Sequence, residues 1–271
     1  MFTLIDKFIA KIKLYPLVLW SLSGIFLLGV AFSYWRILPY SPQALLFEAF
    51  VILFVSFVVN AIFASVFQAR TSAKSVAITA LILVLIITPP EAKNLLSNLP
   101  LLIWAPVLAM GSKYILAIRH KHLFNPAAFA VALTGLTINQ SASWWVSSVV
   151  ILPAVIAAGI LIARKMRRFD LVLIFLLVSF AAMLGFSLAA RSDFLLVLEQ
   201  AFVYTPLVFF AFIMLTEPHT MPQSKLARWI FAALVAFLMV PSVHLGSIYF
   251  TPELALLTGN ILAFFTRPKL I

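Results

Sequence analysis

The sequence predicts an all-α polytopic membrane protein with ten transmembrane helices. Of its 271 residues, 64% are hydrophobic and only 10% are charged, and the mean hydropathy is +1.14. Soluble domains have about 45–50% apolar and about 25% charged residues, so this composition excludes a soluble globule. The apolar residues also form long segments between short polar loops, which is the pattern of a chain that crosses a membrane repeatedly.

Ten apolar segments follow one another, each bounded by proline, charge or a polar cluster. A spanning helix needs about 20 mostly apolar residues, and the third, fifth and tenth segments are shorter than that. We expect these segments to form a single transmembrane domain over residues 16–271. The segments are residues 16–38, 42–68, 75–88, 99–118, 125–138, 143–163, 169–188, 194–216, 226–243 and 252–266.

Residues 1–15 precede the first segment and mix apolar with charged residues. Phe2, Ile5 and Phe8 are interspersed with Lys7 and Lys11, and no small-residue cleavage site typical of a signal peptide follows. The pattern predicts an amphipathic helix that lies in the membrane interface.

The basic residues predict the orientation, because Lys and Arg are retained on the cytoplasmic side of a membrane. With ten spans and a cytoplasmic N-terminus, only Arg36, Lys93 and Arg191 of the 19 basic residues fall in outer loops. We therefore expect both termini to be cytoplasmic, in a bacterial inner membrane. The net charge of +11 then reflects contact with the lipid bilayer and not with nucleic acid.

An internal repeat relates the two halves of the chain, residues 16–138 and 143–266. The third segment ends near Thr88-Pro89 and the eighth near Thr216-Glu217-Pro218, while the fifth and tenth both contain Leu-Thr-Gly, at 133–135 and 257–259. Because each half has five spans, the two halves must have opposite orientations in the membrane. Inverted repeats of this kind place a binding site at the interface between the halves, next to the ends of interrupted helices.

Several classes of chemistry are excluded by composition. The chain has no cysteine and four histidines, which removes disulfides, thiolate metal ligands and cysteine nucleophiles. No metal-ligand cluster and no Ser-His-Asp arrangement stands out. We predict no catalytic residue and no metal site.

The strongest candidate site is where a basic loop leads into the short fifth segment at Asn125-Pro126. Asn125 is either an ordinary N-cap, with Pro126 at the first helical position, or a hydrogen-bonding group for a ligand at the helix N-terminus. Lys113, Arg119 and His122 supply positive charge nearby. For Lys113 the alternative role is a lysine that reaches the membrane interface, and for Arg119 it is ordinary loop charge.

A second candidate follows the eighth segment, at Thr216 and Glu217. A carboxylate at the end of an apolar span is costly unless it has a partner. Glu217 could pair with His219 or a basic residue, bind a cation, or be solvated at the inner interface.

Other polar and aromatic residues in the spans have simpler expected roles. Glu48 lies within two turns of an outer helix end, so we expect water or Arg36 to satisfy it. Asn60 is expected to join helices through hydrogen bonds. Trp144 and Trp145 are expected in the aromatic belt at the outer membrane surface.

Two motifs carry a resemblance to a known family. The sequence FNPAA at 124–128 after a basic loop, and MLTEPHTMP at 214–222 after the eighth span, resemble the NqrB/RnfD family over roughly residues 75–266. This family comprises the flavin-carrying membrane subunits of the sodium-pumping NADH:quinone reductase and of the Rnf electron-transport complex. The resemblance implies a ten-helix 5+5 inverted repeat, similar to the urea and ammonium channel fold, that holds flavin in the membrane.

The resemblance also implies which flavin to expect. Members with covalent FMN carry a Ser-Gly-Ala-Thr type segment after the fifth span, whereas this chain has TINQSAS at 137–143. We therefore expect a non-covalent riboflavin or FMN near Asn125 and His122, without the phosphoester link.

Two functions remain open at this point. The first is a membrane-embedded flavin-binding electron-transfer subunit or domain of an NAD(P)H- or ferredoxin-linked redox complex. Its partner would be a cytoplasmic ferredoxin-reductase-like FAD/NAD(P)H module, fused or separate, or other subunits of the complex. The second is a channel or transporter for a small solute or ion on the same scaffold, because fold does not fix function.

Overall fold

The computed structural model describes residues 10–91, 95–118, 121–191, 193–199, 206–246 and 248–266. Within them it has four helices that are long and apolar enough to cross a membrane: α2 (Leu14–Tyr34), α3 (Pro42–Val66), α5 (Leu95–Ile115) and α8 (Phe169–Ala189). The chain is mostly helical, as the composition predicts. Most of the predicted interfacial helix, and Arg119, lie outside the described residues.

The predicted short segments are short helices. The third is α4 (Ala73–Ile86), the fifth is α6 (Pro126–Ile138) and the tenth is α12 (Pro252–Phe265), with 14, 13 and 14 residues. The remaining larger helices are α7 (Leu152–Met166) and α11 (Lys225–Leu238). Two small antiparallel hairpins complete the described structure, β1 (Ala117–Ile118) with β2 (Lys121–His122) and β3 (His244–Leu245) with β4 (Ile248–Tyr249).

The sixth predicted segment begins as a turn and not as a helix. Residues 143–151 include the 3₁₀ turn η2 (Trp145–Ser147), and α7 begins only at Leu152. The backbone N–H groups of Ser143 and Trp144 both donate to the carbonyl of Ile86, at 3.0 and 2.8 Å. This turn therefore satisfies carbonyls at the C-terminal end of α4, which have no partner within their own helix, and it cannot continue a helix of its own.

The two tryptophans of this turn are buried, so their predicted place in an interfacial belt is wrong. Trp144 Nε1 donates to Glu253 Oε1 at 2.9 Å and Trp145 Nε1 donates to the Val84 carbonyl at 2.6 Å. Both indoles thus satisfy acceptors inside the protein, where an unpaired polar group would be costly.

The eighth predicted segment, residues 194–216, is not one continuous helix. It contains α9 (Phe194–Glu199), and then α10 (Leu207–Phe209) after Pro206, followed by η4 (Phe210–Met214). The N–H of Leu215 donates to the carbonyl of Phe210 at 2.9 Å, a π-helical step. Proline has no N–H to continue a helix from the preceding turn, and π-helical turns are frequent at functional sites.

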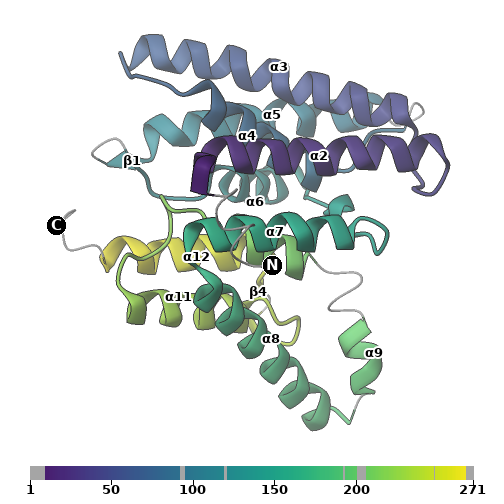
Figure 1. The fold of residues 1–271 in the computed structure, drawn as a ribbon, viewed down its shortest axis with the longest axis vertical. Helices are drawn as coiled ribbons and strands as arrows, with labels where there is room; N and C mark the ends of the chain where they lie inside the picture. The colour runs from purple at the N-terminus through teal and green to yellow at the C-terminus, as the bar shows by residue number, and fades with distance from the viewer. Residues whose placement is uncertain are drawn as a thin grey trace.

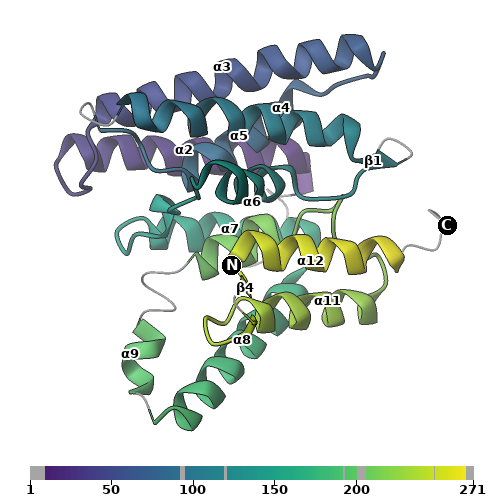
Figure 2. The same ribbon diagram turned by 180° about the vertical axis from the view of Figure 1, so that it is seen from behind.

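The helices pair in the same way in both halves of the chain. In the first half α2 packs on α4, α3 on α5 and α5 on α6; in the second half α7 packs on α10 and η4, α8 on α11 and α11 on α12. The halves meet where α2 contacts α7 and where α6 contacts α12. Figures 1 and 2 show α2 to α5 on one side of the molecule, α8 and α11 on the other, and α6 and α12 at the junction.

Glycines allow the close contacts within the second half. A Cβ on Gly159 of α7 would lie 2.4 Å from Phe212 Cγ, and a Cβ on Gly259 of α12 would lie 2.4 Å from Val235 Cγ2. Small residues at such crossings let helices approach closely inside a membrane.

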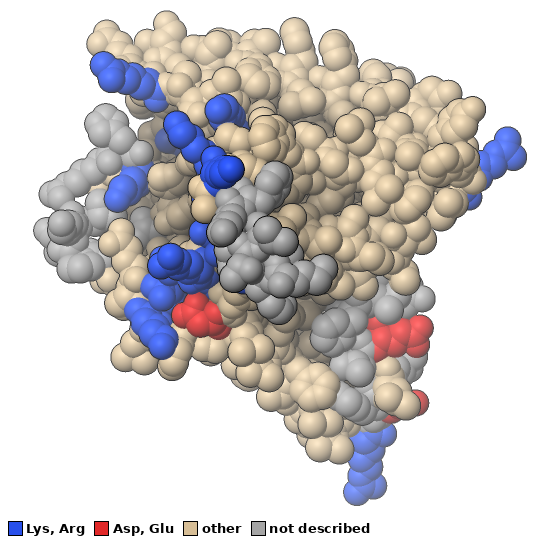
Figure 3. All heavy atoms as spheres, viewed as in Figure 1, with Lys and Arg blue, Asp and Glu red and all other residues tan. Residues whose placement is uncertain are grey.

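Basic residues gather at one end of the helical bundle, which we call the basic end. Figure 3 shows most of the Lys and Arg side chains on the side where α12 finishes. At the opposite end the described part of the chain has Arg36 and Arg191. The basic residues at the ends of helices and in loops of the basic end are Lys11, Lys13, Arg70, Lys74, Lys113, Lys121, Arg164, Lys165, Arg167, Arg168, Lys225 and Arg228.

Candidate functional site

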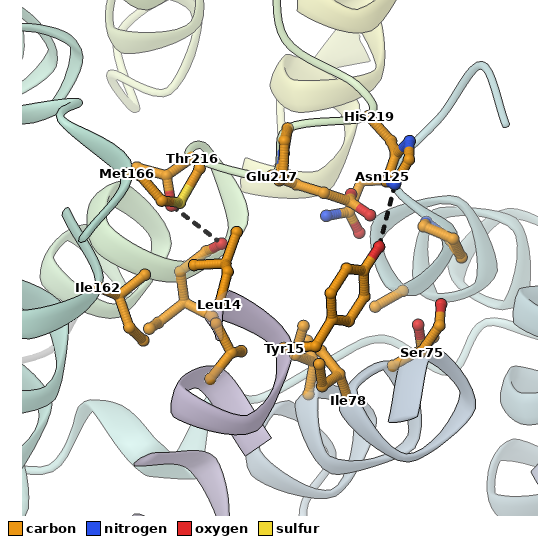
Figure 4. A pocket seen from close by; sticks show the side chains of 17 residues that line it. Leu14, Tyr15, Ser75, Ile78, Asn125, Ile162, Met166, Thr216, Glu217 and His219 are labelled. Atoms are coloured by element: carbon orange, nitrogen blue, oxygen red, sulfur yellow. Dashed lines mark hydrogen bonds between the residues drawn. The ribbon is translucent and has the colours of Figure 1, made fainter. Parts of the chain in front are cut away.

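A pocket lies toward the basic end, between the start of α2, the start of α4, the start of α6, the end of α7 and the segment after η4. Its cavity volume is about 80 Å³. Figure 4 shows the side chains of α2, α4, α6 and the 213–219 segment arranged around it. It is lined by Leu14, Tyr15, Val18, Ser75, Ile78, Thr79, Ile82, Asn125, Pro126, Ala127, Ile162, Met166, Ile213, Thr216, Glu217, Pro218 and His219.

The start of α6 forms one wall of the pocket. Asn125 is the N-cap: its side-chain Oδ1 accepts a hydrogen bond from Ala128 N at 3.0 Å, and Pro126 takes the first helical position. Asn125 is only 2% exposed and lines the pocket. Among the described residues, none accepts a hydrogen bond from its side-chain NH₂. The predicted capping role is therefore confirmed, and the amide keeps a donor for a ligand.

A histidine and a carboxylate from distant parts of the chain pair beside this wall. His122 Nε2 lies 2.9 Å from Glu217 Oε1, with the two side chains 13% and 23% exposed. Thr220 Oγ1 donates to the other carboxylate oxygen, Oε2, at 3.3 Å. Of the alternatives left open for Glu217, the structure shows pairing with a basic residue, and that residue is His122.

The charge around Glu217 keeps this acid ionised. Burial favours the protonated acid, but His122, His219 and Lys113 together hold the pKa of Glu217 below its ordinary value. An opposite charge nearby and a hydrogen bond to the carboxylate both favour the charged form. The site therefore combines one acid of lowered pKa with three basic side chains, His122, His219 and Lys113.

Tyr15 closes the pocket from α2. Its hydroxyl lies 3.0 Å from His219 Nε2, and Figure 4 shows its ring extending across the pocket toward His219. The His219 ring in turn lies 5.2 Å from the His122 ring, centroid to centroid. The sequence placed Tyr15 in a surface helix, and nothing in the local pattern distinguishes it from an interfacial tyrosine.

Lys113 lies in the last turn of α5, next to the pocket wall. Its Nζ donates to the carbonyl of Ser75 at 3.0 Å and to Ser75 Oγ at 3.3 Å. Ser75 lines the pocket, so the ammonium group of Lys113 lies behind a lining residue and close to the site. The alternative of a lysine reaching freely to the interface does not hold.

Thr216 lines the pocket but its hydroxyl is already engaged. Its Oγ1 donates to the carbonyl of Phe212 at 2.7 Å, and the residue is 1% exposed. This back-bond continues the irregular end of η4. Thr216 therefore forms part of the pocket wall, and its hydroxyl is already used within the protein.

Asn260, which the sequence reasoning missed, joins the two halves at the site. Its Oδ1 accepts from the backbone N–H of Asn125 at 2.9 Å, and its Nδ2 donates to the carbonyl of Thr220 at 3.2 Å. Asn260 comes from α12, so the N-terminus of α6 is fixed by a short helix of the other half of the chain. Its position close behind the repeated Leu-Thr-Gly was the available signal.

The five predicted site residues thus lie together, although up to 104 positions separate them in the chain. Asn125, Thr216 and Glu217 line the pocket, His122 bonds to Glu217, and Lys113 bonds to the lining residue Ser75. Opposite them, Ile78, Ile82, Ile162 and other aliphatic residues form an apolar wall. In the described part of the chain, no group of three or more His, Cys, Asp or Glu residues could hold a metal ion.

Comparisons with known proteins add no relative. No protein-family model matches the sequence, and no curated protein matches it significantly.

Proposed function

We propose that this chain is a membrane-embedded flavin-binding subunit or domain that transfers electrons in an NAD(P)H- or ferredoxin-linked redox complex, and that it belongs to the NqrB/RnfD family. The observation that carries the proposal is the start of α6. There a helix N-terminus, and an amide NH₂ that has no acceptor among the described residues, lie at a pocket whose other wall is mainly aliphatic.

The residues that line the pocket offer the two kinds of surface that a flavin ring needs, and the cavity of about 80 Å³ must widen to admit the ring. Its pyrimidine edge needs hydrogen-bond partners and its dimethylbenzene edge needs an apolar slot. In our proposal the Asn125 amide donates to a pyrimidine carbonyl, while Ile78, Ile82 and Ile162 contact the apolar edge. Riboflavin and FMN both present this ring, and both supply one- and two-electron transfer when bound.

The charges of the site suit a ring that gains negative charge. The N-terminus of α6 carries the positive end of the helix dipole, and Lys113 adds a cation behind Ser75. Glu217 holds His122 in place through the 2.9 Å contact. Tyr15 lines the pocket and is bonded to His219, and in our proposal its ring contacts the flavin.

The attachment is proposed to be non-covalent. Thr137, the threonine of the segment where the family carries its covalent FMN, donates its hydroxyl to the Leu133 carbonyl at 2.7 Å. The neighbouring Ser143 hydroxyl is in contact with Thr88 Oγ1. These hydroxyls serve the protein's own contacts.

The membrane arrangement is part of the same proposal. We propose ten spans in a 5+5 inverted repeat, in a bacterial inner membrane with both termini in the cytoplasm. The repeated helix pairings and the meeting of α2 with α7 and of α6 with α12 support the repeat. The basic end supports the orientation. The pocket then opens toward the cytoplasm, where an FAD/NAD(P)H reductase module could deliver electrons.

A channel or transporter for a small solute or ion is the second candidate, because a second pocket lies at the start of α12. Thr251 is the N-cap of α12 and Pro252 its first residue, as Asn125 and Pro126 are for α6. This pocket includes Trp144, Thr251 and Glu253, and it shares no lining residue with the first pocket. Solute passage would require the contact of α6 with α12 to open.

The visible absorption spectrum of the detergent-purified protein separates the two candidates. Electron transfer predicts the bands of oxidised flavin, bleached by dithionite, with riboflavin or FMN released on acid denaturation in about equal amount to the protein. A colourless protein that binds neither added riboflavin nor added FMN would refute the proposal. Solute flux through liposomes containing that colourless protein would support the second candidate.

A further inference from the structure

A buried acid without a partner lies at the opposite end of the molecule from the flavin pocket. Glu48 of α3 is 0% exposed, and neither of its carboxyl oxygens has a hydrogen-bond partner among the described residues. Arg36 is therefore not its partner, contrary to one of the two expected alternatives, and bulk solvent does not reach it. Glu48 is six residues into α3, or about 9 Å along the helix axis, so its carboxyl group is held inside the packed bundle.

The charged groups around Glu48 are few. Of the elements packed against α3, α4 has only Lys74 and α5 only Lys113 and Tyr114 as titratable residues in the described chain, all at the basic end. On α2 the nearest is Tyr34, which is 75% exposed. Arg36 and Tyr40 belong to the α2–α3 loop. An ionised carboxylate in this place has no cation to compensate its lost hydration, whereas a protonated carboxyl is neutral.

Tyr40 is the tyrosine of the α2–α3 loop whose electrostatic interaction with Glu48 reaches across to α3. Tyr40 and Ser33 line an open hollow at this end of the molecule. Burial is the main cause that raises the pKa of Tyr40, so its hydroxyl keeps its proton and is available as a hydrogen-bond donor. The Ser33 hydroxyl is buried without a partner as well. Among the described residues no hydrogen bond joins either hydroxyl to Glu48, so a proton passing from the hollow to Glu48 needs water between these groups.

A further polar group continues beyond Glu48 on the same buried face of α3. Ser56, two turns deeper, is 0% exposed and its Oγ also has no partner in the described chain. Asn60 follows one turn later and is fully engaged, because Tyr114 donates to its Oδ1 at 2.7 Å and its Nδ2 donates to Thr71 at 2.9 Å. The unpartnered oxygens of α3 thus lie between Glu48 and Ser56, and the polar side chain one turn beyond, Asn60, has partners.

We propose that Glu48 is a proton-binding site that exchanges its proton with water at the end of the molecule opposite the basic end, through Tyr40 and the hollow that it lines. The reaction is reversible protonation of one carboxyl group, with the proton taken from that water. A sodium ion would need several oxygen ligands around it, and no cluster of this kind surrounds Glu48. The site is independent of flavin binding, because no residue near Glu48 lines the α6 pocket.

Labelling with a hydrophobic carbodiimide tests the assignment, because the reagent attacks protonated carboxyl groups in apolar surroundings. We expect dicyclohexylcarbodiimide to modify Glu48 in the full-length protein in liposomes, as read by mass spectrometry of peptides. The labelling should slow as the pH rises, stay unchanged when NaCl replaces choline chloride, and be lost in Glu48→Gln. No labelling of Glu48 at any pH, or protection by Na⁺ at constant pH, would overturn the proposal.

Infrared spectroscopy of the wild-type protein gives a second reading that does not depend on a variant folding. A carbonyl band of a protonated carboxyl group should be present, shift on transfer to D₂O, and disappear in Glu48→Gln. Tyr40→Phe should slow the D₂O shift, whereas Tyr34→Phe, at an exposed tyrosine of the same end, should not. A band that never shifts in D₂O, or equal exchange in both tyrosine variants, would overturn the route through Tyr40.

Discussion

The replacement Asn125→Ser separates the two roles of this residue. The Asn125 oxygen caps α6 by accepting from Ala128 N at 3.0 Å, while its NH₂ has no acceptor among the described residues. Serine ranks with asparagine as an N-cap, so the variant keeps the cap and loses only the donor that we assign to flavin. The structure therefore predicts a change in flavin binding without an equal change in folding stability.

The size of the effect follows from one neutral hydrogen bond. Such a bond contributes about 0.5–1.5 kcal/mol, which corresponds to a dissociation constant roughly 2–12-fold higher. Asn125→Ala removes the cap as well, which costs about 1 kcal/mol of stability in addition. We expect Asn125→Ser to bind flavin more weakly at nearly unchanged Tm, and Asn125→Ala to bind weakly with a lower Tm.

The assay is titration of flavin-free protein in detergent into riboflavin or FMN, followed by quenching of flavin fluorescence. Thr251→Ala is the matched control, because it removes the N-cap of α12, where Thr251 Oγ1 accepts from Leu254 N at 3.3 Å, without touching the first pocket. It should lower Tm and leave the flavin affinity unchanged. An Asn125→Ser protein that binds flavin as tightly as wild type would refute the role of the amide.

Three further predictions test the packing, the charge and the membrane arrangement. Gly159→Val should destabilise the protein by about 1–3 kcal/mol, because its Cβ would lie 2.4 Å from a phenylalanine ring atom. Gly185→Val is the control and should be near neutral, because nothing lies within 4 Å of a Cβ there. Equal melting temperatures of the two variants would contradict this prediction. The pKa of Glu217 is held below its ordinary value, so its contribution to stability is complete above about pH 4.3 and is lost as the pH falls through the lowered pKa. The variant Glu217→Gln should therefore remove this part of the dependence of Tm on acid pH. An unchanged profile of Tm against pH would contradict the prediction. Single cysteines at the exposed residues Gln43 and Gln68, near opposite ends of α3 in a chain that has no other cysteine, should react with an impermeant maleimide from outside and inside the cell respectively; labelling of both from one side would exclude the span.

The sequence predicted the helices well where a single segment decides the structure. The segments that became α2, α3, α5 and α8 needed only length and apolar composition. It failed where another part of the chain decides. Residues 143–151 form a turn because the carbonyls at the end of α4 need donors, and the eighth segment is broken before α10 and continues into the π-helical turn η4. Neither cause can be seen within the segment itself.

The candidate site was predictable in its residues but not in its contacts. Local sequence identified Glu217, because a carboxylate beside an apolar span is costly without a partner. It identified Asn125 because a short helix begins at this Asn-Pro pair. The partners came from tertiary structure: His122 for Glu217, Asn260 for the backbone of Asn125. Hydrogen bonds between α6 and α12 depend on how the two halves of the chain pack, and a local sequence pattern does not predict that packing.

The most direct test of the proposed function is an experimental density map of the protein purified with riboflavin or FMN added. The account predicts a planar three-ring density in the pocket between the start of α2 and the start of α6, with a pyrimidine carbonyl within hydrogen-bonding distance of the Asn125 amide. Flavin density at a different place, or a flavin-saturated sample in which side chains fill that pocket, would contradict it.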